Sequence, residues 1–195
     1  MITHDLIHID NNKLLINWDA VLQIKEFQVL METKQNPKWH LEGDVFTHTM
    51  YVTNMVLHIF GNSNVRLNRI MLMAALFHDI GKGVCTVEID GAYKSRGHAE
   101  HSDIILRKIL KEDEYIEYIS FFVRNHMKPL EIMHLSFEEC INEIREILND
   151  CDGGICTIDN LIKLKTCDCV GSVMQSEDGW RETLQDFKRA SEFQA

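Results

Sequence analysis

The chain has 195 residues, of which 45% are hydrophobic and 26% are charged, a composition typical of globular proteins that argues against disorder. Its 30 acidic and 20 basic side chains give a formal net charge of -10. This balance argues against binding to duplex DNA, because such binding depends on clustered Lys and Arg. The length fits one ordinary domain, so we expect a single domain over residues 1–195.

The sequence contains no stretch typical of a membrane span or a signal peptide. No apolar run approaches the roughly 18 residues that a span requires, and His, Asp, Asn and Lys interrupt the first twenty residues. We therefore expect a cytoplasmic protein without a membrane partner, whose six cysteines are reduced. A zinc site is the less favoured alternative for four of them, because their spacing matches no common zinc motif. These four are Cys151, Cys156, Cys167 and Cys169.

Apolar residues recur at helical spacing through most of the chain, which has only two prolines. The turn pair Asp90-Gly91 interrupts this pattern between two short β-type runs and predicts a β-hairpin near residues 86–95. Ser136 to Glu139 forms a capping box that opens a helix, and Thr157 can cap another. The predicted class is therefore all-α with one short hairpin. Helices are expected over residues 19–32, 43–60, 64–78, 98–110, 113–127, 136–149, 157–174 and 177–192.

Four polar residues lie on helix faces that otherwise read as buried: His48, His78, His126 and Asp168. An unpaired polar group in such a place costs about a few kcal/mol. A single inward histidine is most simply a hydrogen-bonded core residue, and a single inward aspartate a cap or an ion-pair partner. Four on four different helices are better explained if they converge on a metal ion, since imidazole and carboxylate together suit Mn, Fe, Ni, Co or Zn.

The adjacent pair His78-Asp79 adds a geometric constraint. Neighbours on a regular helix point about 100° apart, so both can reach one ion only near a helix end. Gly81 supplies such an end, because glycine commonly terminates helices.

These residues resemble a known pattern. His48, the run from Ala74 to Lys82, Gly97-His98, Asn125-His126 and Asp168 are similar to the motifs of the HD superfamily of metal-dependent phosphohydrolases. The stretch from Pro37 to Thr49 also resembles the HD domain of bacterial tRNA nucleotidyltransferases. The resemblance covers about residues 37–172. No polymerase domain precedes it, so tRNA end addition is not expected.

The resemblance implies an HD-type helical bundle with one or two divalent ions (Mn, Fe, Ni, Co, Mg or Zn). Carried over position by position, His48, His78, Asp79 and Asp168 hold one metal. His98 and His126 fit the positions that hold a second metal, with Asp79 bridging the two. Asp152 and Asp159 are nearby alternatives to Asp168, which we prefer because it lies on the apolar stripe and is followed by Gly171-Ser172.

Other polar residues near these motifs have predicted roles in the same site. Asp79 is expected to act in catalysis with Lys82, which can donate to a phosphate oxygen. Arg96 and His101 are candidate substrate-binding residues. Glu42 and Asp44 are candidates for orienting the metal ligands, although Asp44 could instead favour the positive end of its helix.

The implied reaction is hydrolysis of a phosphate ester by metal-activated water. The resemblance suggests small nucleotides or RNA ends as substrates: a 2',3'-cyclic phosphodiester, a 2'-phosphate or a nucleoside monophosphate. A cyclic-dinucleotide or dinucleoside polyphosphate hydrolase is one alternative. A non-enzymatic metal- or nucleotide-binding module is another.

Overall fold

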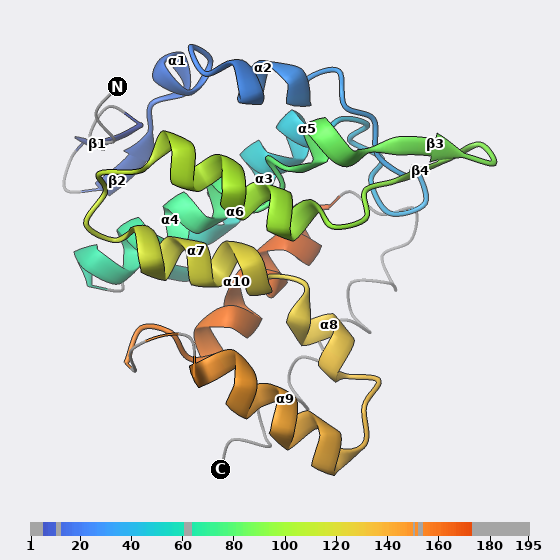
Figure 1. Cartoon of the computed structure of the whole chain (residues 1–195). Helices are drawn as coiled ribbons and strands as arrows, with labels where there is room; N and C mark the ends of the chain where they lie inside the picture. Colours follow the sequence, from blue (N-terminus) through green and yellow to red (C-terminus); the bar gives the residue numbers. More distant parts are fainter. Residues whose placement is uncertain (1–5, 11–12, 61–63, 150, 152–153, 173–195) are drawn as a thin grey trace.

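The computed structural model describes residues 6–10, 13–60, 64–149, 151 and 154–172, and the statements below concern those residues. The helix predicted over 177–192 lies outside them. In chain order the elements are β1 (Ile7–Asp10), β2 (Lys13–Ile16), α1 (Trp18–Val21), α2 (Lys25–Leu30), α3 (Val45–Phe60), α4 (Val65–Phe77), α5 (Lys82–Cys85), β3 (Val87–Ile89), β4 (Ala92–Lys94), α6 (His98–Ile109), α7 (Ile116–Asn125), α8 (Lys128–Ile132), α9 (Phe137–Asn149) and α10 (Ile158–Gly171) (Figure 1). The all-α prediction is confirmed.

Helix α4 forms the centre of the bundle. All its side chains from Ile70 to Phe77 are inaccessible to solvent, as expected for a helix that is hydrophobic on every side. It contacts α3, α6, α7 and α10, and strand β2 covers part of it. Because four helices pack around α4, residues at its C-terminal end lie close to side chains from all of them. No helix in the described part of the chain is long and apolar enough to cross a membrane.

Local signals in the sequence account for several element boundaries. The hairpin β3–β4 turns at Asp90 and Gly91, both of which have positive φ, at 53° and 73°. Thr157 caps α10 by accepting from the backbone N–H of Asn160. The Ser136–Glu139 capping box forms in both directions at the start of α9.

The structure differs from the prediction at several places, and the short helices α5 and α8 were among the elements not predicted. The helix expected over 19–32 is split into α1 and α2, because Ile24 takes an extended backbone conformation between them. The helix expected from residue 113 begins only at Ile116, since the Asp113 carboxylate accepts instead from the Tyr115 N–H and from Arg69. The antiparallel pair β1–β2 was not predicted, because four-residue strands show too few alternations to reveal a period of two.

The expectation of six reduced cysteines is wrong for one pair. Cys151 and Cys156 form a disulfide, and their Cα atoms lie 5.9 Å apart, within the usual range for such a bond. Cys167 and Cys169 have free thiols on α10. Among the described residues, no cysteine takes part in a cluster that could hold a metal ion, so the alternative of a cysteine zinc site receives no support.

Candidate metal centre

The His78-Asp79 pair lies where α4 ends, in a turn that α6 holds in place. The backbone N–H of Lys82 donates to the Asp79 carbonyl at 2.9 Å, which closes the turn. The Ser102 hydroxyl donates to the His78 carbonyl at 2.8 Å and accepts from the Gly81 N–H at 2.9 Å. The pair is therefore anchored by backbone contacts on both sides.

Gly81 serves this turn for a reason that the sequence did not reveal. Its φ of -67° is accessible to any residue, so it is not the left-handed terminator that we expected. A Cβ atom placed on Gly81 would lie 2.3 Å from the His98 carbonyl oxygen and 2.5 Å from the Ser102 nitrogen. The glycine is needed because α6 passes directly over the turn.

Close packing of α10 on α3 brings His48 and Asp168 together. A Cβ atom on Gly171 would lie 2.8 Å from Cγ2 of Val52, so the small residue permits this approach. The Asp168 carboxylate then reaches His48, with Oδ1 at 2.9 Å from Nε2. Of the two alternatives to Asp168, Asp159 points to solvent and pairs with Lys163, whereas Asp152 lies outside the described residues.

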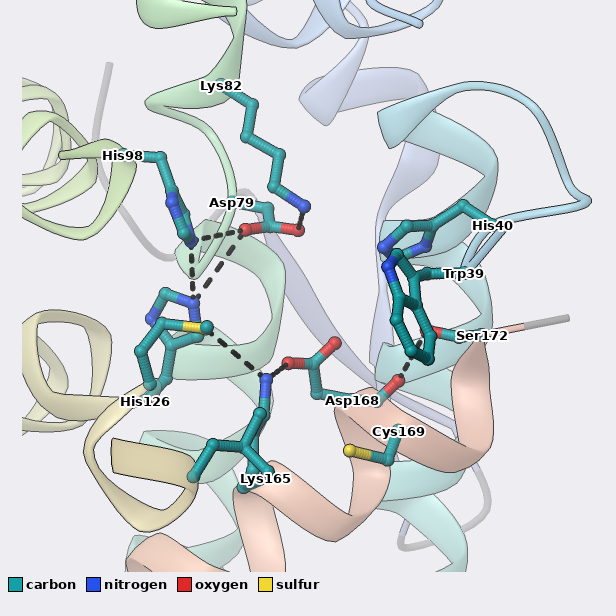
Figure 2. A pocket seen from close by; sticks show the side chains of 12 residues that line it. Trp39, His40, Asp79, Lys82, His98, His126, Lys165, Asp168, Cys169 and Ser172 are labelled. Carbon is teal, nitrogen blue, oxygen red and sulfur yellow. Dashed lines mark hydrogen bonds and ion pairs between the residues drawn. The ribbon is translucent and has the colours of Figure 1, made fainter. Parts of the chain in front are cut away.

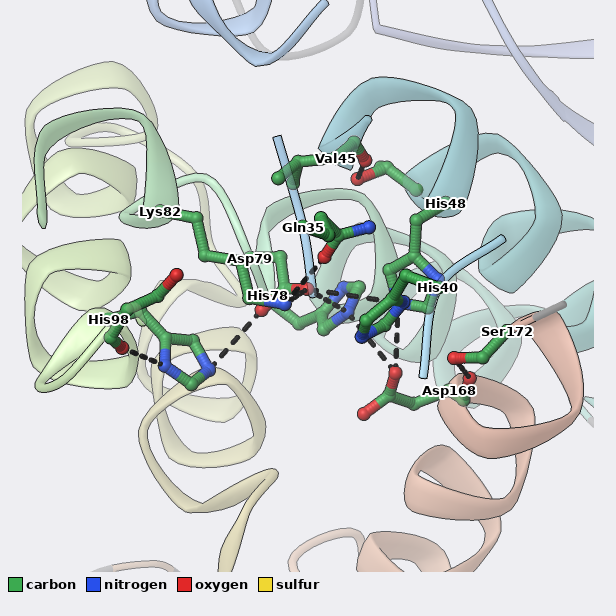
Figure 3. Close-up of polar contacts among 12 residues, drawn as sticks. Gln35, His40, Val45, His48, His78, Asp79, Lys82, His98, Asp168 and Ser172 are labelled. Atoms are coloured by element: carbon green, nitrogen blue, oxygen red, sulfur yellow. Dashed lines mark hydrogen bonds and ion pairs between the residues drawn. The ribbon is translucent and has the colours of Figure 1, made fainter. Parts of the chain in front are cut away.

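His48, His78 and Asp168 form a first ligand group, whose ligand atoms all lie within 4.8 Å of one another (Figure 3). Nε2 of His78 lies 3.7 Å from Oδ1 of Asp168 and 3.2 Å from Oδ2 of Asp79. The same Asp79 oxygen lies 3.7 Å from Nε2 of His48. Asp79 therefore turns Oδ2 toward this group.

Asp79, His98 and His126 form a second ligand group (Figure 2). Oδ1 of Asp79 lies 3.3 Å from Nε2 of His98 and 3.8 Å from Nε2 of His126. The two histidine Nε2 atoms are 3.1 Å apart. One aspartate thus contributes a different oxygen to each group.

Backbone carbonyls fix the orientation of three of these histidines. The Nδ1 atoms of His78, His98 and His126 lie 2.7 to 2.8 Å from the carbonyl oxygens of Ala75, Ser95 and Val123. A carbonyl only accepts, so each Nδ1 carries a proton and each Nε2 is left to face the aspartates. This is the arrangement in which proteins hold imidazole for metal binding.

Burial and neighbouring charge favour neutral rings in the second ligand group. Desolvation lowers the pKa of His98, and it lowers that of His126 well below the usual range together with repulsion from His78 and His98. Neutral rings protonated on Nδ1 direct two lone pairs at each other across 3.1 Å, which is unfavourable alone. The buried Oδ1 of Asp79 also has no hydrogen-bond partner among the described residues. A divalent cation would satisfy all three atoms, so the donors present fit a metal ion.

The first ligand group holds a proton when no ion is bound. Burial by itself lowers the pKa of His78, but the Asp79 charge and the hydrogen bond to Asp168 outweigh it and raise this pKa to about 10. The pKa values of both aspartates lie well below the usual range, because the positive charges of His78 beside Asp79 and of Lys165 beside Asp168 outweigh desolvation.

Metal binding is therefore expected to release about one proton per ion held by the first ligand group. Because His78 loses its proton only near pH 10, apparent affinity should rise about tenfold per pH unit between about pH 6 and 9. Calorimetric titration in two buffers with different ionisation enthalpies measures the protons released. Equal heats in both buffers would contradict the assignment of His78 as a ligand.

The ligand groups open into a cavity of about 430 Å³ that reaches Lys82, Met127 and Leu130. The Lys82 ammonium forms an ion pair with Oδ2 of Asp79 at 2.7 Å and donates to Oε1 of Gln35 at 2.9 Å. A second cavity of about 290 Å³ adjoins it and shares Lys82 and His98 with it. Lys82 is thus placed beside the ligands, where the sequence predicted it.

The remaining predicted residues take different places. Glu42 lies beside the site, with Oε1 at 3.1 Å from Nδ1 of His48, although the atoms are not aligned for a hydrogen bond. Asp44 caps α3 by accepting from the Thr47 backbone and hydroxyl, so the alternative role at the start of its helix is the observed one. Arg96 and His101 are exposed, and neither lines the two cavities.

Several residues at the site were not predicted, among them Trp39, His40 and Lys165. Trp39 and His40 line both cavities from the loop before α3. Lys165 is buried, and its ammonium donates to Oδ2 of Asp168. The sequence carried a signal for Lys165, because it falls four residues after Leu161 on the stripe that leads to Asp168. The loop residues show no periodicity that could reveal them.

Comparison with known families agrees with this geometry. The family model described as HD domain matches residues 45–161, more than half of the chain. The matched span contains His48, His78, Asp79, His98 and His126 and ends before Asp168, whose placement therefore rests on the structure. The match does not single out the tRNA nucleotidyltransferase subgroup. Among curated proteins, none matches this chain.

Proposed function

Because this chain belongs to the HD domain family, whose members are metal-dependent phosphohydrolases, we propose that it hydrolyses phosphate esters of small nucleotides or RNA ends. The observation that carries the proposal is the convergence of four histidine Nε2 atoms on the carboxylates of Asp79 and Asp168. Six such side chains from five segments would be costly to bury without a bound cation. These residues could hold a divalent ion, which when bound would supply activated water and neutralise charge on the phosphoryl oxygens.

Residues of the chain would position the metal ions and the substrate. Asp79 presents one oxygen to each ligand group, so we propose that it would help to hold an ion in either group. Lys82 is held by Asp79 and Gln35 at the junction of the two cavities, where its ammonium can donate to a phosphoryl oxygen. The cavity of about 430 Å³ is of the size that takes a small ligand or a chain end.

The test is a substrate screen with the metal controlled. The chain is purified metal-free, loaded separately with Mn, Fe, Ni, Co, Mg or Zn, and assayed with 2',3'-cyclic nucleotides, 2'-nucleotides and nucleoside monophosphates. Turnover with at least one metal, lost on chelation and restored on adding the metal back, is expected. If the protein neither binds a metal nor turns over any substrate, the proposal is wrong.

A second candidate is hydrolysis of cyclic dinucleotides or dinucleoside polyphosphates. The position of Asp79, which turns one oxygen toward each ligand group, favours it, because two-metal sites suit in-line displacement at phosphorus. The number of bound ions tests whether the site takes two metals. Replacing His98 and His126 by Ala should leave one ion per chain where the unmodified protein holds two. Metal binding with no hydrolysis of either substrate set would instead favour a non-enzymatic binding module.

A further inference from the structure

Lys165 is a buried cation in the wall of the cavity. Its side chain is 6% exposed, and its ammonium contacts Oδ2 of Asp168 and, at 3.4 Å, the sulfur of Met127. The Asp168 carboxylate compensates the charge of the buried ammonium through this ion pair. The other Asp168 oxygen, Oδ1, faces the histidines of the first ligand group. Lys165 and the ligand histidines therefore use different oxygens of one carboxylate.

The position of Lys165 complements that of Lys82. Lys82 enters from the Asp79 side of the cavity and Lys165 from the Asp168 side, with the ligand residues between them (Figure 2). A phosphoryl group beside Asp79 and Lys82 leaves Lys165 on the far side of the site. Met127 contacts Lys165, and Leu130 and Cys169 line the same cavity.

The charges that line the cavity favour an anionic ligand at this position. Its two carboxylates, Asp79 and Asp168, are balanced by the two lysines before any cation is bound. Each divalent ion adds positive charge that a buried site must compensate. One phosphoryl group compensates the charge beside Lys82 but not that at Lys165.

We propose that Lys165 binds a second anionic group of the substrate, so that the preferred substrates carry two linked phosphates. This inference rests on the proposed function and narrows its substrate class. Two sources share this chemistry: a nucleoside diphosphate or polyphosphate, and an RNA end in which a backbone phosphate neighbours the reacting one. A nucleoside monophosphate lacks the second phosphate, so none of its groups would bind Lys165.

The test compares ligand pairs that differ by one phosphate in the metal-loaded protein. AMP and ADP probe the diphosphate source, and the 2',3'-cyclic phosphates of adenosine and of ApA probe the RNA-end source. Dissociation constants are measured by calorimetry, and metal content is measured after each titration. The variants are Lys165→Met, which keeps the length, and Lys165→Arg, which keeps the charge. Lys163→Met on the same helix is the matched control, because Lys163 is exposed and pairs only with Asp159 among the described residues.

The unmodified protein is expected to favour the two-phosphate member of at least one pair by about 10- to 100-fold, the range of one charge-assisted hydrogen bond. The Lys165→Met variant should lose this preference at unchanged metal content, whereas Lys165→Arg and Lys163→Met should retain it. The pair that shows the preference identifies the source.

The inference is overturned if the unmodified protein shows no preference in either pair, or if Lys165→Met keeps it. A protein that binds these ligands with the preference but hydrolyses nothing in the screen would contradict the proposed function and leave the role of Lys165 standing. The two failures are therefore distinguishable.

Discussion

Replacing Asp79 by Ala is expected to lower kcat/KM by about 10³-fold or more, since loss of several kcal/mol of electrostatic stabilisation has this effect. Among the described residues, Asp79 is the one carboxylate that faces both ligand groups, so its removal should weaken both at once. Metal content should fall with activity, because an ion would keep only neutral imidazoles and Asp168. Initial rates and elemental analysis on the same preparation measure the two effects.

The control for this variant is Asp159→Ala, which removes an exposed carboxylate from α10. It should leave activity and metal content unchanged, and circular dichroism should show similar helicity for both variants. Substantial turnover by Asp79→Ala with its metal retained would contradict the bridging role.

Replacing Gly81 by Ala is expected to destabilise the protein by about 3 kcal/mol and lower Tm by roughly 6 to 12 °C. The added methyl group would meet two backbone atoms of α6, the His98 oxygen at 2.3 Å and the Ser102 nitrogen at 2.5 Å. Backbone cannot rotate aside as a side chain can, so either α6 or the turn must move. Because His98 begins α6 and Asp79 lies in the turn, the second ligand group should be distorted and metal affinity should fall too.

Gly83→Ala provides the matched comparison, two residues away in α5. The nearest atoms to its Cβ atom would all belong to side chains, with methyl groups of Val29 at 3.2 Å and Leu30 at 3.3 Å that can move aside. Its effect should stay within about 1 kcal/mol, helped by the higher helix propensity of Ala. Urea denaturation of the two variants measures the difference. Equal midpoints would show that the approach of α6 does not constrain Gly81.

The sequence by itself determined the helical class and the candidate ligands. Both follow from local rules: apolar periodicity marks helices, and a polar residue on an apolar face marks a buried polar site. His48, His78, His126 and Asp168 were found in this way, and His98 through the family resemblance. Turn and capping residues, which are also local signals, predicted the β3–β4 hairpin and the caps of α9 and α10.

Only the tertiary structure decided how these residues combine. It placed Glu42 beside His48 and used Asp44 as a helix cap, although the two lie in the same short stretch. It left Arg96 and His101 outside the cavities and brought in Trp39, His40 and Lys165. The neighbours of each side chain depend on how α3, α6 and α10 pack around α4. Sequence patterns within a single segment do not reveal contacts between segments that are distant along the chain.

At Gly81, too, local sequence predicted the feature and tertiary packing supplied the reason for it. The sequence indicated that a glycine follows the His-Asp pair and that the helix ends there, and α4 does end at Phe77. The reason proved to be tertiary, because α6 passes over the turn too closely for a Cβ atom. The order of residues determined where the candidate ligands lie along the chain. The packing of separate helices determined that His48, His78, Asp79, His98, His126 and Asp168 share one centre.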